Sequence, residues 1–196
     1  MRLYYTANSP YARITRVALR ESGLRPRVEE IEVRTRDAES DYFRITPLAR
    51  VPVLEDGGAI IADTRDICAH FDTLEGRTRW FPPEDDDARL MRHVTTGFLD
   101  GVAVWLRENM RPDGQRSDPV MRYEEHRASQ VLRWLAPRWQ GVGRWDFTAV
   151  TLACAIDIAR DRGMAQGWAD IAPDVMDWAG TRAGCPFMAE TAPGPA

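Results

Sequence analysis

Lysine is absent from the sequence, and basic residues are fewer than acidic ones. All 26 basic residues among the 196 are arginines, and 30 acidic residues give a net charge of −4 at neutral pH. A chain with this balance lacks the basic surface on which non-specific binding of nucleic acid depends. We therefore expect no nucleic-acid partner.

Cysteine and histidine are nearly as scarce, with three of each. The cysteines are Cys68, Cys154 and Cys185, and the histidines are His70, His93 and His126. The odd number and wide spacing of the cysteines exclude a disulfide framework, and neither residue type follows a metal-ligand spacing. The sequence therefore predicts no metal site and a reducing, cytoplasmic compartment.

Long apolar runs are missing too. No stretch approaches the 18 residues that a membrane-spanning helix needs, and the first five residues read as the start of a strand rather than as a signal peptide. Hydrophobic residues make up 44% of the chain and charged residues 29%, which is typical of a soluble globular protein. We expect no membrane partner.

The pattern of the chain changes near residue 76. Before it, short strands alternate with helices in the order strand–helix–strand–short helix–strand–strand–helix. We expect the strands at residues 3–6, 28–33, 51–54 and 59–62. Asp56-Gly57 marks a hairpin between the last two. The pattern predicts an α/β domain over residues 1–75.

Beyond a proline-containing linker over residues 76–86, the pattern becomes helical. Apolar residues recur at spacings of three and four, as they do along one face of a helix. The clearest of these stripes comprises Leu152, Ala155, Ile156 and Ala159. Asp146 is placed to cap the helix that carries it. Residues 87–196 are therefore expected to form an all-helical domain.

Three features of the first domain have chemical potential, and the first is Ser9-Pro10, where a strand turns into a helix. Serine before proline is a typical helix start, so Ser9 reads first of all as a capping residue. Its hydroxyl can also donate a hydrogen bond to an anion at the helix N-terminus. If that anion is a thiolate, its pKa falls and more of it is nucleophilic at neutral pH.

The other two features are Val51-Pro52 and Asp63-Thr64. A proline that enters a strand marks an edge, a bulge or a cis bond, and an unpaired Val51 backbone can bind an extended peptide. Asp63 and Thr64 start the next helix, where they either cap it or grip the charged end of an amino-acid-like ligand. Each feature alone is ordinary, and only their combination is distinctive.

With these features the chain resembles the glutathione transferase superfamily, in particular its bacterial cytosolic members. The segments that carry the resemblance are 9–13, 16–19, 46–54 and 56–67, and more weakly 152–155, Pro173, Trp178 and Pro186-Phe187. The resemblance implies the glutathione transferase fold: an α/β thioredoxin-like N-terminal domain followed by an all-α C-terminal helical domain. It also implies a homodimer.

By resemblance, the sulfur of glutathione would lie at the Ser9-Pro10 turn. Ser9 would hydrogen-bond the sulfur, with Tyr5 as the alternative because some classes of the superfamily use a tyrosine hydroxyl instead. Ala12 stands where thioredoxin-like redox proteins have a second cysteine, so a disulfide reductase is disfavoured.

The rest of the tripeptide would lie along the other two features. By resemblance, Val51 would pair its backbone with the cysteinyl unit beside a cis Pro52. Asp63 and Thr64 would bind the γ-glutamyl end, and Arg50 would meet the glycyl carboxylate. The chain departs from the superfamily in having alanine for the usual glycine of the 46–50 segment, and Asp-Thr for the usual Glu-Ser pair.

The implied activity is that of a glutathione S-transferase in detoxification, in which the thiolate of glutathione, a co-substrate, attacks a small hydrophobic electrophile. We expect the electrophile to lie between the domains. The residues predicted to line its pocket are Tyr11, Val104, Trp105, Glu108 and Arg111. Two other functions stay open: a non-catalytic glutathione transferase-like binding module, and a glutathione-dependent isomerase or dehalogenase.

Overall fold

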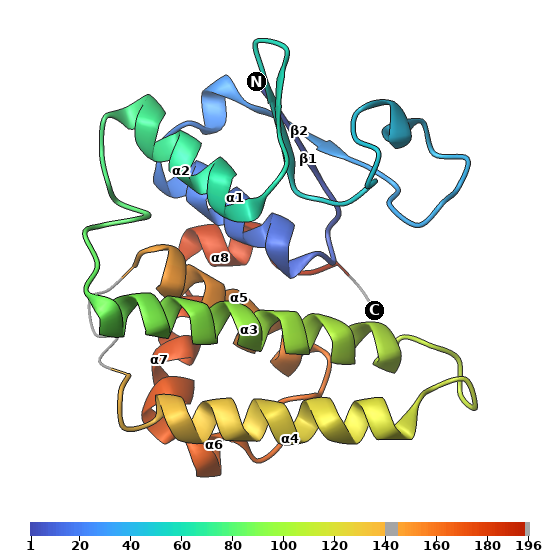
Figure 1. Cartoon of the computed structure of the whole chain (residues 1–196), viewed down its shortest axis with the longest axis vertical. Coiled ribbons are helices and arrows are strands. Elements are labelled where there is room, and N and C mark those ends of the chain that lie inside the picture. Colours follow the sequence, from blue (N-terminus) through green and yellow to red (C-terminus); the bar gives the residue numbers. More distant parts are fainter. Residues whose placement is uncertain (140–144, 195–196) are drawn as a thin grey trace. The chain divides into compact units, whose positions relative to one another are not determined.

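The structure, a computed structural model, describes residues 1–139 and 145–194 of the chain (Figure 1). It divides into two compact units. The first unit consists of residues 1–83 and 186–194, and the second of the described part of residues 84–185.

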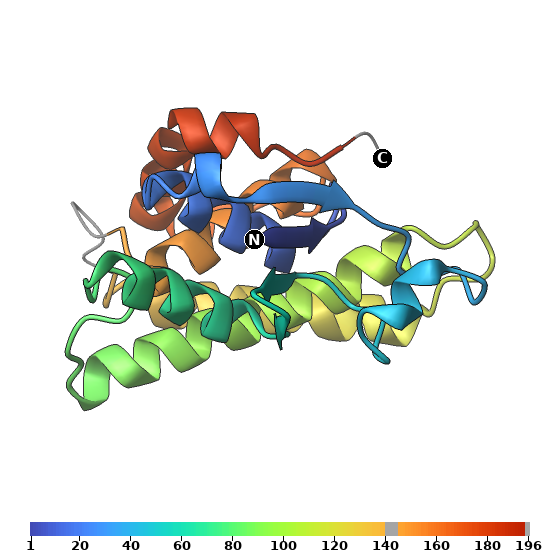
Figure 2. The same cartoon turned by 90° about the horizontal axis from the view of Figure 1, so that it is seen from above.

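The first unit is built on a four-stranded mixed sheet. Its strands are β1 (Arg2–Tyr5), β2 (Glu29–Glu32), β3 (Val53–Asp56) and β4 (Ala59–Ile61), in the spatial order β2-β1-β3-β4. β1 and β2 are parallel, and their arrows point the same way in Figure 2. β3 is antiparallel to both β1 and β4. The four expected strands are therefore present, with β3 beginning one residue after the proline rather than before it.

Beside the sheet, the first unit contains two helices and two short 3-10 turns before residue 83. The helices are α1 (Pro10–Glu21) and α2 (Thr64–Glu75), and the turns are η1 (Arg25–Arg27) and η2 (Asp41–Arg44). α1 packs against α2 and β1. Side chains alternate across a strand, so Tyr5 lies under Arg16 of α1 while Tyr4 faces Tyr42 of η2 on the opposite side. The site described below therefore has α1 on one face of the sheet and η2 on the other.

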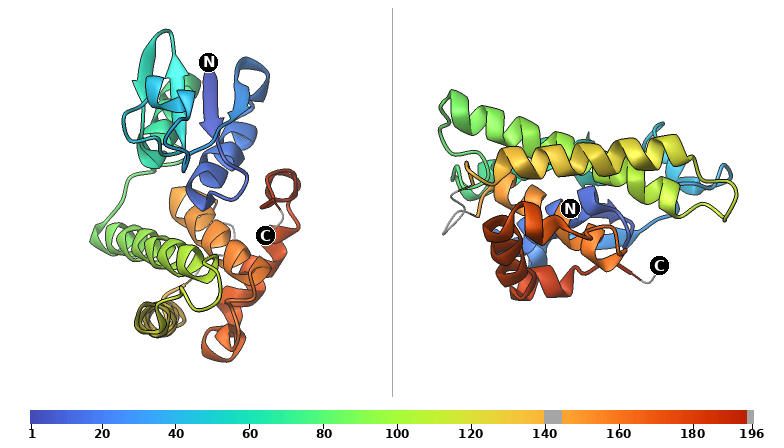
Figure 3. Two further views of the ribbon diagram at one scale, coloured as in Figure 1. Left: turned by 90° about the vertical axis from the view of Figure 1, so that its right-hand side faces the viewer. Right: turned by 90° about the horizontal axis from the view of Figure 1, so that it is seen from below.

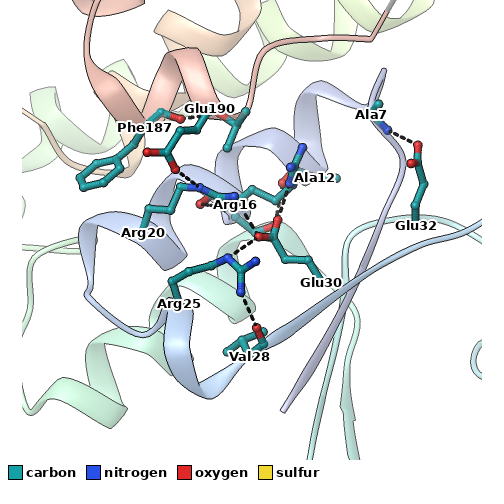
Figure 4. Close-up of polar contacts among 12 residues, drawn as sticks. Ala7, Ala12, Arg16, Arg20, Arg25, Val28, Glu30, Glu32, Phe187 and Glu190 are labelled. Atoms are coloured by element: carbon teal, nitrogen blue, oxygen red, sulfur yellow. Dashed lines mark hydrogen bonds and ion pairs between the residues drawn. The ribbon is translucent and has the colours of Figure 1, made fainter.

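The last helix, α8 (Pro186–Glu190), belongs to the first unit and packs on α1. The buried Arg13 donates from Nη2 to the Met188 carbonyl at 2.9 Å. Arg20 forms an ion pair of 3.0 Å with Glu190, which Figure 4 shows. This differs from the expectation that the helical domain runs to residue 196. Two arginines of α1 bind a segment about 170 positions away in the chain, and no local pattern signals such a contact.

The described residues of the second unit form helices and no strand. The helices are α3 (Asp86–Asn109), α4 (Asp118–Leu135), α5 (Phe147–Asp161), α6 (Trp168–Ile171) and α7 (Pro173–Ala183). α3 and α4 lie side by side (Figure 3), and α5 packs against α3 and α7. The apolar stripe predicted around Ile156 is fully buried, and Asp146 caps α5 by accepting from the Ala149 N–H at 3.0 Å. None of the helices in the described residues has the length and apolar character needed to cross a bilayer.

Candidate functional site

The pairing of the strands brings the three sequence features to one end of the sheet. β3 runs antiparallel to β1 and to β4, so the carboxyl ends of β1 and β4 lie beside the amino end of β3. Ser9 follows β1, Val51-Pro52 precedes β3, and Asp63-Thr64 follows β4. Ser9 and Asp63, which are 54 positions apart in the chain, therefore lie at the same end of the sheet as Val51.

Ser9 is the N-cap of α1. Its backbone is extended (φ −87°, ψ 113°), Pro10 occupies the first helical position, and Ser9 Oγ accepts a hydrogen bond of 3.2 Å from the Ala12 N–H. A hydroxyl carries one donor and two acceptor positions. Capping uses an acceptor position and leaves the O–H able to donate to an anion, so the capping role and the thiolate role of Ser9 are compatible.

The loop before Ser9 is held by a glutamate that the sequence analysis did not single out. The Ala7 N–H donates to Glu32 Oε1 at 3.2 Å, and Glu32 is the last residue of β2 (Figure 4). Glu30 lies two residues earlier on the same strand and accepts from Arg16 Nε at 2.6 Å. Glu30 and Glu32 stand two residues apart on a predicted strand, and this spacing indicates that both side chains lie on one face of the sheet.

The two tyrosines that could serve a thiolate lie on opposite faces of the sheet. Tyr4 is buried and donates from its hydroxyl to Glu55 Oε2 at 2.8 Å. Tyr5 lies on the α1 face, with the Arg16 guanidinium 4.1 Å from the centre of its ring. Tyr5, and not Tyr4, therefore shares a face of the sheet with the helix that Ser9 begins.

Val51 offers an unpaired backbone at the start of β3. The Val51–Pro52 peptide bond is cis, as expected from the resemblance, and Val51 is half-buried. Across residues 1–139 and 145–194, neither the N–H nor the C=O of Val51 has a hydrogen-bond partner. Arg50 beside it is exposed and forms no ion pair with any described residue. This edge can accept an extended peptide with a carboxylate near Arg50.

Asp63 is the N-cap of α2. Its Oδ1 accepts from the Arg65 N–H at 2.7 Å, and its side chain is exposed. Thr64, the first residue of the helix, is buried. The helix N-terminus carries partial positive charge and favours a carboxylate, while the exposed Asp63 carboxylate favours an ammonium group. The two ends of an amino acid therefore have complementary partners at this point.

The residues predicted to line an electrophile pocket come from both units. Tyr11 is half-buried on α1, whereas the other four lie on or just after α3. Trp105 is only 8% exposed. Glu108 accepts from the Ser117 N–H at 2.5 Å and pairs with Arg111 at 3.1 Å, so both are engaged in the turn between α3 and α4. The pocket stays a prediction.

No group of three or more potential metal ligands occurs in the part of the chain that the structure describes. No disulfide joins the three cysteines, all of which lie in the described residues; Cys68 and Cys154 are buried, and Cys185 is half-buried.

The first unit thus has the element order, the cis-proline before β3 and the helix start after β1 that define a thioredoxin-like domain, and a helical unit follows it. Residues 8–74 match the family of the glutathione S-transferase N-terminal domain. No curated protein matches the chain. Many solved structures share its fold.

A glutathione transferase family member from Pseudomonas fluorescens, solved with bound glutathione, is 22% identical over 99% of both chains, with a TM-score of 0.85. A glutathione S-transferase from Methylobacillus flagellatus with glutathione bound is 22% identical over 98% of this chain and 99% of its own, with a TM-score of 0.80. One from Methylobacterium radiotolerans, in complex with glutathione sulfonate, is 22% identical over 100% and 95%, with a TM-score of 0.81. Residues 8–74 thus match the N-terminal domain family of glutathione S-transferases, and the chain shares the fold of these three solved structures.

Proposed function

We propose that the first unit binds glutathione as a co-substrate and that the protein joins glutathione, through its thiolate sulfur, to a small hydrophobic electrophile. The observation that carries this proposal is the meeting of Ser9, the unpaired Val51 backbone and Asp63 at one end of the sheet. The relatives from Pseudomonas fluorescens and Methylobacillus flagellatus, which hold glutathione, support it.

In this proposal the tripeptide is held along its whole length. The cysteinyl unit pairs with the N–H and C=O of Val51 as an added strand would. The ammonium group of the γ-glutamyl end lies on Asp63, and its carboxylate lies at the N-terminus of α2, next to Thr64. The glycyl carboxylate meets Arg50, whose guanidinium suits a carboxylate better than a lysine ammonium would.

Ser9 acts on the sulfur. Its O–H donates to the thiolate, and the N-terminus of α1 adds partial positive charge. Both favour the charged form and lower the pKa of the thiol; each unit of that shift corresponds to about 1.4 kcal/mol. The thiolate then attacks an electrophilic carbon, a sulfur–carbon bond forms, and a leaving group such as halide departs with the bonding electrons. Tyr5 is the alternative donor because it lies on the same face as α1.

The electrophile is proposed to bind near Tyr11 and near Val104, Trp105, Glu108 and Arg111. We also propose that the protein is a homodimer that acts in detoxification in the cytoplasm, where glutathione is kept reduced. Leu48 and Phe43 support self-association, because they leave 67% and 46% of their surface exposed on neighbouring parts of the first unit. Sedimentation velocity measures the oligomeric state directly.

Calorimetry with glutathione, followed by a conjugation assay with a generic aryl halide, tests the proposed function. We expect saturable binding and formation of the thioether. Binding without conjugation, over a panel that also contains isomerase and dehalogenase substrates, would favour a non-catalytic binding module. Absence of any heat at millimolar glutathione, with the protein shown to be folded by circular dichroism, would contradict the proposal.

A further inference from the structure

Tyr42 lies outside the proposed glutathione site but is bonded to the segment that forms it. It belongs to η2, is 4% exposed, and donates from its hydroxyl to the Arg50 carbonyl oxygen at 2.9 Å. The sequence pattern predicts only a short helix around residues 39–44 and marks no role for Tyr42. A hydroxyl buried this deeply and aimed at one backbone carbonyl fixes the position of that carbonyl.

The carbonyl that Tyr42 holds belongs to the same peptide group as the Val51 N–H. A trans peptide group is planar, and its C=O and N–H point in opposite directions. A hydrogen bond to the Arg50 C=O on one side therefore sets the direction of the Val51 N–H on the other. The bond also polarises the peptide group, which strengthens the N–H as a donor. In the described residues the Val51 N–H has no hydrogen-bond partner, so it can donate to a ligand.

Tyr42 also holds the other end of the turn that leads to Arg50. Its own carbonyl accepts from the N–H groups of Ile45 and Thr46, at 3.0 and 3.3 Å. Between the two ends, Ala49 is buried and has a φ of +44°, in the left-handed region that L residues rarely adopt. A conformation of this kind persists only where its surroundings enforce it. Tyr42 supplies such surroundings at both ends of the turn.

The environment of Tyr42 keeps its hydroxyl a donor. Its ring packs against that of Tyr4, with the ring centres 5.6 Å apart, in a cluster that includes Ala49 and Val53. Burial, together with the neighbouring Tyr4, raises the pKa of Tyr42 well above its usual range. The hydroxyl therefore stays protonated at neutral pH and keeps its bond to the carbonyl.

We propose that Tyr42 is a positioning residue for glutathione, which orients the Val51 N–H toward the tripeptide through the Arg50–Val51 peptide group. The inference rests on the proposed function, because it assumes that Val51 pairs with glutathione. Tyr42, which is buried on the face of the sheet opposite α1, would then increase the affinity for the tripeptide.

The test compares Tyr42→Phe with Tyr4→Phe. Each variant removes one hydroxyl from the same buried ring pair, but the Tyr4 hydroxyl bonds Glu55 and not the Arg50 carbonyl. We expect Tyr42→Phe to raise the Kd and KM for glutathione about fivefold, the size of one net hydrogen bond, with kcat at saturating glutathione unchanged. Tyr4→Phe should change Kd by less than about twofold.

Amide hydrogen exchange without glutathione provides a second measurement. We expect faster exchange over residues 46–51 in Tyr42→Phe than in Tyr4→Phe, at equal melting temperatures. Equal Kd values for the two variants, or a loss in Tyr42→Phe that falls on kcat alone, would overturn the inference while leaving glutathione binding intact. Failure of the wild-type protein to bind glutathione would instead overturn the proposed function, and with it this role of Tyr42.

Discussion

Two aspartates begin helices in the same way in the two units, yet they differ in what surrounds them. Asp63 caps α2 by accepting from the Arg65 N–H at 2.7 Å, and Asp146 caps α5 by accepting from the Ala149 N–H at 3.0 Å. Asp146 is 5% exposed, whereas Asp63 is exposed at the end of the sheet, beside the segment that carries Val51. A capping signal is thus the same for a residue that only stabilises a helix and for one that we propose to bind glutathione, and only the tertiary surroundings separate the two.

Two buried glutamates extend this comparison and carry the largest expected effect. Glu30 accepts from three arginines, Arg16, Arg20 and Arg25, at 2.6 to 2.9 Å. Among the described residues Glu124, in the second unit, has one arginine partner, Arg127, and its side chain is about as buried as that of Glu30. Removal of one partner from a buried ion pair costs about 3 kcal/mol. We expect Glu30→Gln to lower the free energy of unfolding by about that amount and Glu124→Gln by about 1 kcal/mol. Urea denaturation of both variants measures the free energy of unfolding. Equal losses of stability in the two variants would contradict the difference that we expect between Glu30 and Glu124.

The pH dependence of the Glu30 effect follows from its pKa. Burial by itself raises the pKa of Glu30, but the hydrogen bonds from Arg20 and Arg16 outweigh it, so the pKa lies below its usual 4.5. The stability that this carboxylate supplies is therefore fully present above pH 4.5, its value in the unfolded chain, and is lost as the pH falls through the lower folded pKa.

The stability difference between the wild-type protein and Glu30→Gln should accordingly narrow as the pH falls below about 4.5. Glu29→Gln is the matched control, because Glu29 is exposed on the same strand, and we expect it to change stability by less than about 0.5 kcal/mol. A difference between the wild-type protein and Glu30→Gln that grows toward acid pH would contradict the account.

The two capping aspartates give a smaller effect on stability and a sharper effect on binding. We expect Asp146→Ala to cost about 1 kcal/mol of stability through loss of the cap and to leave the Kd for glutathione unchanged. Asp63→Ala should cost no more stability but raise that Kd about tenfold, which corresponds to about 1.4 kcal/mol. Calorimetry and thermal denaturation of the pair separate the two roles. If both variants lose affinity equally, Asp63 is only a cap.

Much of the fold could be predicted because its signals are local. The cap at Ser9, the hairpin at Asp56-Gly57, the cap at Asp146 and the stripe on α5 each lie within a few residues, and each is present in the structure. The antiparallel pairing that follows from the hairpin also brings Asp63 to the end of the sheet where Val51 lies.

What could not be predicted depends on contacts between distant segments. Arg13 and Arg20 read as polar positions of a helix, and only the folded chain shows that they bind α8. Tyr42 reads as one apolar position in a short turn, because nothing local marks Arg50 as the partner of its hydroxyl. The pairing of Glu108 with Arg111 was likewise outside the prediction, which considered the face of the helix but not the turn that follows it.

The pKa of the thiol of bound glutathione, followed by the ultraviolet absorbance of its thiolate, tests the central claim most directly. The account predicts a value below the 8.5 or so of a free thiol and a rise of about one unit in Ser9→Ala, with lower turnover and a nearly unchanged Kd. Ser117→Ala, at the cap position of α4 where the side chain makes no capping bond, should titrate like the wild-type protein. A titration curve that is the same in Ser9→Ala as in the wild-type protein would contradict the account and move the role to Tyr5 or elsewhere.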